Sequence, residues 1–291
     1  MGGVKMLALA GATALVTTAT YAADFPPAMP PAMPQYVQAP PVDTGGWYLR
    51  GDIGVGRQNF TDFPHFQTNP AFVWPASWRI DQKDMKSATF VGFGAGYSWN
   101  NWLRFDVTGE YRSKVPVKVL GSYTEFCPEG RCFDLYDMNH SAWVGLINAY
   151  LDLGTWWCVT PFVGVGVGGA YHTIWSATDI GFITGPGTTG FGFADQNQFS
   201  KMNFAWAAHA GLAYDVTAKF KVELAYRYLS MGDVVTSTIN CSGSGCAGTG
   251  PRAYYHLKSF DSHDFKIGVR WMLQPDPAPQ PVYAPPLMRR G

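Results

Sequence analysis

The 291-residue sequence is poor in charge and has no excess of either sign. Charged residues make up 14% of the chain, and 21 Lys and Arg residues balance 21 Asp and Glu residues. Nucleic-acid binding depends on cations that neutralise phosphates, and no basic surface is indicated here. We therefore expect no nucleic-acid partner.

Long apolar runs are missing beyond the N-terminus, so no segment there predicts a transmembrane helix, which needs about 20 apolar residues. The N-terminus itself has Lys5, an apolar run over residues 6–16 and small residues up to Ala22. This pattern predicts a secretory signal over residues 1–22. The run is too short and too rich in Ala and Thr for the alternative, an N-terminal membrane helix.

Cysteines are few, and four of the five form two close pairs in CPEGRC and CSGSGC. In an exported protein this spacing predicts two loop disulfides, Cys127–Cys132 and Cys241–Cys246. A metal site would require all four to meet across two loops, so we expect no metal. Cys158 is left over as a free thiol in a short connection.

Strict alternation of apolar and polar residues is the dominant pattern that is present. In WLRFDVTGEYR, Leu103, Phe105 and Val107 fall on one side of an extended strand, and Arg104 and Asp106 fall on the other. Each segment with this pattern is about long enough to cross a bilayer as a tilted strand, which takes ~9–11 residues. The segments are 47–59, 87–99, 102–114, 141–153, 160–175, 202–215, 219–231 and 264–273.

The connections alternate between short and long. The short ones are 100–101, 154–158 and 216–218, and the long ones are 60–86, 115–140, 176–201 and 232–263. Outer-membrane barrels have this arrangement, whereas nothing in a soluble β-sandwich requires its short and long connections to lie at opposite ends of the strands. The sequence therefore predicts an all-β protein of the cell outer membrane of a Gram-negative bacterium. Its fold class is an eight-stranded antiparallel up-and-down transmembrane β-barrel with four long extracellular loops and short periplasmic turns.

Aromatic residues near the strand ends decide which face is outside. They share the apolar face, as membrane interfaces select, so the apolar face should contact lipid and the charges should point inward. These aromatic residues are Trp47, Trp99, Tyr111, Trp143, Tyr171, Tyr214, Tyr228 and Trp271. Unpaired buried charges are costly, so we expect a lumen network of ion pairs. Its members are Arg50, Asp52, Arg104, Asp106, Glu110, Arg112, Asp152, Asp215, Lys221, Glu223, Arg227, Lys266 and Arg270.

Two glycine runs have the inward parity of strands 87–99 and 160–175, and they leave room for large side chains opposite. They are Gly92, Gly94 and Gly96, followed by Gly164, Gly166 and Gly168. A phosphate-binding loop would need a following helix and a Lys, and neither is present.

Proline-rich segments flank the patterned region and predict extended periplasmic ends. The expected organisation is a signal peptide over 1–22, a proline-rich segment over 23–45, the barrel over 46–273 and a proline-rich tail over 274–291. A plain linker is favoured over contact with peptidoglycan.

Four stretches resemble the small outer-membrane β-barrel proteins of alphaproteobacteria, the opacity-like, porin-annotated relatives of the OmpA and OmpX barrels. They are GWYLRGDIGVG, NAYLDLG, PFVGVGVGGAY and ELAYRYL, and the likeness covers about residues 45–273. It implies an abundant and largely structural barrel surrounded by outer-membrane lipid and lipopolysaccharide and inserted by the barrel-assembly machinery. Such barrels usually end on an aromatic residue, but here the last strand ends in Trp271-Met272-Leu273 and a proline tail follows.

The expected function is a structural envelope barrel with at most a narrow porin-like channel, without a cofactor. Two alternatives stay open. The aromatic loop 60–86 could bind an extracellular ligand, for example haem through His65 or His140, although packing of the loops on one another is favoured. Lipid A chemistry at His172-Thr173, His209 or Ser262-His263-Asp264 is less favoured, because Ser262 and His263 would point to opposite faces. We expect no enzymatic activity.

Overall fold

The computed structural model describes residues 45–63, 65–67, 75–125, 127, 130–184, 191–196, 198–237, 239–242 and 251–273. The predicted signal, the rest of the proline-rich segment before residue 45, and the tail 274–291 lie outside these residues. Cys246 also lies outside them, so the predicted Cys241–Cys246 disulfide stays a prediction. The structure contains the predicted Cys127–Cys132 disulfide.

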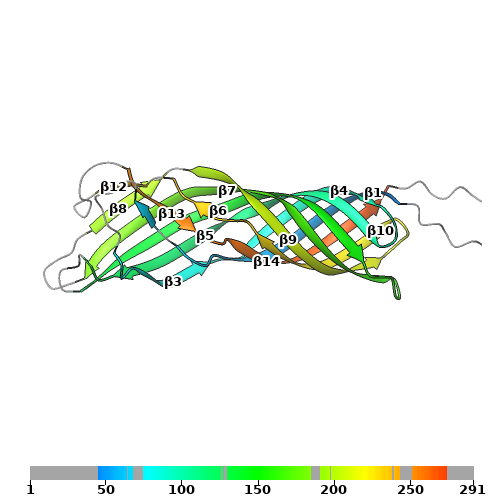
Figure 1. Cartoon of the computed structure of the whole chain (residues 1–291), viewed down its shortest axis with the longest axis horizontal. Coiled ribbons are helices and arrows are strands. Elements are labelled where there is room, and N and C mark those ends of the chain that lie inside the picture. Colours follow the sequence, from blue (N-terminus) through cyan, green and yellow to red (C-terminus); the bar gives the residue numbers. More distant parts are fainter. Residues whose placement is uncertain are drawn as a thin grey trace, which may run out of the picture. The chain divides into compact units, whose positions relative to one another are not determined.

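Strands that each pair with two neighbours close into a ring, in which β1 pairs with both β4 and β14. All pairings around the ring are antiparallel. The ring consists of β1 (Gly46–Asn59), β4 (Ala88–Ser98), β5 (Leu103–Tyr123), β6 (Arg131–Asp152), β7 (Val159–Thr184), β9 (Phe199–Asp215), β10 (Phe220–Ser230) and β14 (Asp261–Met272). The predicted all-β antiparallel barrel is confirmed, and its inclined strands are visible in Figure 1.

Six further strands lie in the segments predicted as long loops, so those predictions are wrong in part. They are β2 (His65–Gln67), β3 (Arg79–Met85), β8 (Phe191–Gln196), β11 (Val234–Val235), β12 (Ile239–Ser242) and β13 (Pro251–Leu257). Together with the far ends of β5, β6 and β7 they form a sheet in the order β3-β5-β6-β7-β8-β12-β13, while β2 and β11 also pair with β13. We call this part the extension; it lies at the long-loop end of the barrel (Figure 1).

Two β-bulges explain why the sequence pattern ends too early. The β5–β6 register shifts between Arg112 and Val115, and the β6–β7 register shifts between Met138 and His140. An extra residue in one strand moves all following side chains to the opposite face. On β5 the buried positions change from even to odd numbers beyond the bulge. Alternation therefore fails near residues 114 and 175 although the strands continue.

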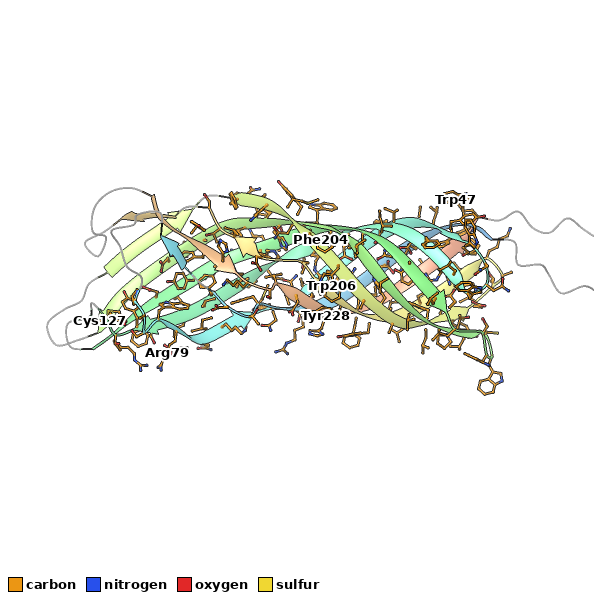
Figure 2. The ribbon with its side chains drawn as sticks, in the orientation of Figure 1. Trp47, Arg79, Cys127, Phe204, Trp206 and Tyr228 are labelled. Carbon is orange, nitrogen blue, oxygen red and sulfur yellow. A yellow bond between two sulfur atoms is a disulfide. The ribbon has the colours of Figure 1, made fainter. Side chains whose placement is uncertain are left out.

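The apolar face points outward, as predicted. Ile53 and Ile147 are 62% exposed, and Phe93 is 71% exposed. On β9, Phe204 and Tyr214 are ten residues apart, which spans about 23 Å along the axis of a barrel with strands tilted ~45°. Figure 2 shows Trp47 at the short-turn end, Phe204 further along the barrel, and Cys127 at the far end of the extension. The two aromatic levels match the apolar band of about 25 Å that membrane barrels present to lipid.

Side chains within the tight turns satisfy backbone donors at the short-turn end. Asn100 Oδ1 accepts hydrogen bonds from the backbone N–H groups of Trp102 (3.0 Å) and Leu103 (2.7 Å). Gly154 begins another turn with a φ of 109°, a backbone conformation that glycine adopts without strain. Cys158 follows as an exposed free cysteine. Among the described residues, no helix is long and apolar enough to span a membrane.

Candidate functional site: the barrel interior

Glu223 on β10 is the anion at the centre of the short-turn half of the lumen. Its carboxylate lies 3.2 Å from Arg270 Nε, 3.4 Å from Arg50 Nη2 and 3.6 Å from Arg104 Nη2. Arg50 and Arg270 lie directly opposite each other in the β1–β14 register. Like charges in this position repel, so Glu223 offsets a repulsion that the register imposes. We call this group, with Asp52, Asp106 and Lys266, the Glu223 cluster.

Asp52 and Asp106 complete the Glu223 cluster. Arg50 donates to Asp52 Oδ1 at 2.9 Å and to Asp106 Oδ2 at 2.7 Å, so one guanidinium serves carboxylates on two strands. Lys266 Nζ lies 3.7 Å from Asp52. All members of the cluster are buried. These charges can be buried only because each of them lies near at least one opposite charge.

A second cluster, around Asp264 on β14, lies nearer the long-loop end. Arg112 donates to both oxygens of Asp264, at 2.8 and 2.9 Å, and Arg227 donates to Asp264 Oδ2 at 2.6 Å. Glu110 accepts from Arg227 at 2.7 Å and from Arg112 at 3.1 Å. The bidentate Arg112–Asp264 pair fixes both distance and orientation between β5 and β14. We call this group the Asp264 cluster.

The remaining predicted members lie at the short-turn rim. Lys221 Nζ pairs with Asp215 at 2.8 Å, and both side chains are about a quarter exposed. Asp152 pairs with Arg104 at 3.1 Å. These rim charges belong to the inward face but are reached by solvent.

Asp264 is absent from the predicted lumen network, although it begins the predicted strand 264–273. The structure instead places Asp264 and Ser262 inside β14, each 0% exposed, with His263 on the outer face. The parity that Asp264 shares with Lys266 and Arg270 was a signal that could have found it. With Asp264, the two clusters and the rim pairs contain seven cations and seven carboxylates among the described residues, instead of the six carboxylates predicted for the network. The opposite directions expected for Ser262 and His263 agree with the structure.

Neutral polar residues that the sequence did not single out join the clusters. Tyr150 accepts a hydrogen bond from Arg50 at 3.1 Å, and Asn148 donates to Asp106 at 2.7 Å. Tyr48 donates to Asp106 at 3.2 Å. Glycine makes room for the large rings, since a Cβ on Gly96 would lie 2.3 Å from Tyr48 and one on Gly164 would lie 2.3 Å from Tyr150.

Apolar side chains fill the lumen beyond the Asp264 cluster, and they come both from the ends of predicted strands and from segments predicted as loops. The buried set includes Leu229, Met231, Ile174, Phe260 and Met138, each at most 1% exposed. A buried histidine pair lies among them. His140 Nε2 is 2.9 Å from His172 Nδ1, and the His172 ring also hydrogen-bonds to the carbonyl of Met231 at 3.1 Å. The lumen thus changes from charged to apolar along its axis.

Two carboxyl groups lie near each other in the extension, and each accepts a hydrogen bond from a tyrosine. Tyr136 donates to Asp134 at 3.3 Å, and Tyr255 donates to Asp179 at 2.7 Å. Burial raises the pKa of Asp134 to about 6. Burial, together with the nearby Asp134 charge, raises the pKa of Asp179 to about 8. Burial also raises the pKa of Tyr123, which lies near both carboxyl groups.

This pair predicts that the extension loosens as the pH rises. A carboxyl whose pKa is raised by folding stabilises the folded state below its unfolded pKa, near 4, and loses this contribution as the pH rises through its folded pKa. We therefore expect amide hydrogen exchange in residues 177–184 of β7, corrected for its intrinsic pH dependence, to be faster at pH 8.5 than at pH 5.5. The Asp134→Asn/Asp179→Asn variant should show no such difference. Equal protection of the wild-type protein at both pH values would contradict the prediction.

The chain is similar to one protein family and to several known proteins. The model of the family "Outer membrane protein beta-barrel domain" matches residues 10–272. An uncharacterized protein of Brucella melitensis is 30% identical over 253 residues, which cover 80% of this chain and 86% of that protein. A Rickettsia prowazekii protein provisionally named an adhesin is 25% identical over 77% of this chain and 86% of its own length. OprG of Pseudomonas aeruginosa aligns with a TM-score of 0.43 at 14% identity, covering 79% of this chain and 97% of OprG.

A closed antiparallel ring with an apolar outer surface and paired charges inside defines a membrane-spanning β-barrel. The chain belongs to the outer membrane protein β-barrel domain family and is located in the outer membrane of a Gram-negative cell. Barrels of this kind carry their long loops outside the cell, so we expect the extension at the extracellular end.

Proposed function

We propose that the protein is a structural barrel of the outer membrane that conducts solutes poorly or not at all. The observation that carries this proposal is the burial of inward side chains at successive levels of the lumen. Arg104 is 1% exposed, Arg112 is 0% exposed, and further along Leu229 and Met231 are also 0% exposed. A water-filled path would expose the side chains that line it.

Opening such a lumen would require costly rearrangements at two levels. At the Asp264 cluster, Arg112 and Arg227 would leave carboxylates to which they donate at distances of 2.6–3.1 Å. At the apolar level, buried side chains would be exposed to water. An eight-stranded ring has an interior that side chains just fill, which supports a closed resting state.

Single-channel recording of refolded protein in planar bilayers tests this proposal. We expect at most small, fluctuating currents, because side chains block the axis at both levels. Arg112→Ala should raise the frequency of brief openings, since it removes the side chain that joins β5 to β14. Lys221→Ala, a change at the exposed rim, should leave the recordings unaltered. A large and stable conductance of the wild-type protein would overturn the proposal.

We propose no catalytic role. Ser262 donates to Asp264 and accepts from Arg112, at 2.5 and 2.7 Å, so its hydroxyl is engaged within a buried ion cluster. His263 lies on the other face of the strand, where Nδ1 is 2.6 Å from Tyr226 Oη. These positions do not support a nucleophile and base acting together. Release of acyl chains from added lipid A would contradict this part of the proposal.

Surface binding is a second candidate function, favoured by the length of the extension. β5, β6 and β7 have 21, 22 and 26 residues, about twice what crossing the bilayer takes. The named adhesin of Rickettsia prowazekii is consistent with such a role. Haem binding through His140 is not supported, because this residue is 1% exposed. The side chains of His65, Phe66, Phe72 and Trp74 lie outside the described residues, so a haem titration followed by the Soret band remains the test for that loop.

A further inference from the structure

Three cations lie near one another on the outer surface, where β1 ends, β4 begins and β5 has its bulge. They are Arg57, Lys86 and Lys114, all exposed, and we call them the cationic patch. Lys86 lies two residues before Ala88, which pairs with Gly56 of β1, and β4 also pairs with β5 up to Arg112. The patch therefore extends across adjoining strands.

Local contacts hold the strands around the cationic patch in place. Lys83, which shares the inward face of Val119 opposite it, donates to Asn59 Oδ1 at 3.0 Å and to the Phe60 carbonyl at 2.7 Å, which joins β3 to the end of β1. Lys114 lies at the β5 bulge, with Nζ 4.9 Å from the centre of the Trp175 ring. The bulge thus turns a cation outward at the level where the lipid-facing surface ends.

Within the part of the chain that the structure describes, none of the three patch cations forms an ion pair. Asp84 lies opposite Lys118 in the β3–β5 register, and Asp137 pairs with Lys118 at 3.1 Å. Asp81 pairs with Arg79 at 2.8 Å. The three patch cations therefore present their positive charge to the surface.

An apolar groove of about 460 Å³ lies on the outer surface directly below the patch. Its lining includes Ile53, Val55, Leu224, Phe265 and Ile267 from β1, β10 and β14. Val55 is two residues from Arg57 on the same strand and face, a separation of about 7 Å. These side chains are 45–62% exposed and face the hydrocarbon of the bilayer.

We infer that the cationic patch and the apolar groove together bind a phosphorylated, acylated glycolipid of the outer leaflet, as in the lipid A part of lipopolysaccharide. The phosphates would lie on the patch, and one acyl chain would occupy the groove below it. Several cations spread over adjoining strands suit a ligand with more than one phosphate better than a phospholipid with a single one. The inference does not depend on the lumen being closed.

The test compares refolded wild-type protein with the Arg57→Gln/Lys86→Gln/Lys114→Gln variant in non-ionic detergent. Bisphosphorylated lipid A is titrated, and the fraction of the protein that carries bound lipid is measured by native mass spectrometry. Each cation near an anionic lipid surface contributes about fivefold to affinity, so we expect binding about a hundredfold weaker in the triple variant. Val55→Trp, which fills the groove and leaves the patch intact, should also weaken binding. All changes are at exposed positions, and single Lys→Gln variants provide the same test should the triple variant not fold.

A matched control removes three exposed cations away from the groove, as Arg79→Gln/Lys118→Gln/Lys258→Gln. It should bind lipid A like the wild-type protein, and an equal loss in this control would reduce the effect to net charge and overturn the site. Dephosphorylated lipid A should bind weakly to all variants, so equal binding of that lipid would overturn the role of phosphate. Displacement of lipid A by inorganic phosphate alone would reassign the patch to free phosphate and also overturn the inference.

Discussion

Glu223→Gln is expected to lower the free energy of unfolding by about 3–5 kcal/mol, because it leaves buried guanidinium groups without their shared anion. Glu223 is 2% exposed and lies within 3.6 Å of Arg50, Arg104 and Arg270. The glutamine keeps the shape of the side chain and removes only the charge. Urea unfolding of protein refolded into lipid vesicles measures the change.

A second substitution distinguishes loss of charge balance from loss of packing. Arg270→Gln in the Glu223→Gln background removes one of the cations left unpaired, so the double variant should be more stable than the sum of the single effects predicts. Lys221→Gln on the same strand is the matched control, since this partly exposed rim pair should contribute about 0–1 kcal/mol. A Glu223→Gln effect as small as that of Lys221→Gln would mean that the cluster does not stabilise the barrel.

The faces of the strands could be predicted from the sequence because each face is a local property. Arg104 and Asp106 alternate with Phe105 and Val107 on one strand, and the choice between lipid and lumen follows from where the aromatic residues fall. The same rule placed Glu223 and Arg270 inside. No knowledge of neighbouring strands was needed for this step.

The partners of each charge could not be predicted, because they depend on register around the whole ring. Glu223 meets Arg104, which is 119 positions earlier in the sequence, only because β10 and β5 project into the same narrow lumen. Arg50 faces Arg270 across a register that alternation alone does not fix. The ion pairs therefore form only when all the strands have closed into the ring in the correct register.

The extension was missed for a different physical reason. Beyond the bulges the odd-numbered residues Val115, Val117 and Val119 point inward, while outward positions such as Lys118 carry charge. That pattern is the reverse of the one at lipid level, where apolar residues point outward. The strand continues from a lipid environment into water. Beyond the membrane surface its apolar residues therefore point inward, and its polar residues point outward. A pattern search that allows one parity change at the aromatic level would have found the continuations of β5 and β7, whereas the buried positions of β6 keep even numbers throughout.

Ile147→Arg is expected to destabilise the barrel by about 2–4 kcal/mol, the cost of a cation at the midplane of a membrane barrel. Ile147 is 62% exposed on the outer face of β6, midway between Trp143 and Leu151. It lies away from both the lumen clusters and the apolar groove. Its substitution therefore tests only whether this face contacts hydrocarbon.

Leu153→Arg is the matched control, because Leu153 is similarly exposed, at 53%, but follows the end of β6 at the short-turn rim. A cation near the interface costs about 0–1 kcal/mol, since its long side chain reaches the headgroups. Unfolding of both variants from vesicles should therefore give clearly different free energies. In thicker bilayers the Ile147→Arg cost should persist, because a mid-strand cation cannot reach water from the hydrocarbon centre. Equal and negligible effects of the two substitutions would show that the apolar face of β6 is in contact with water.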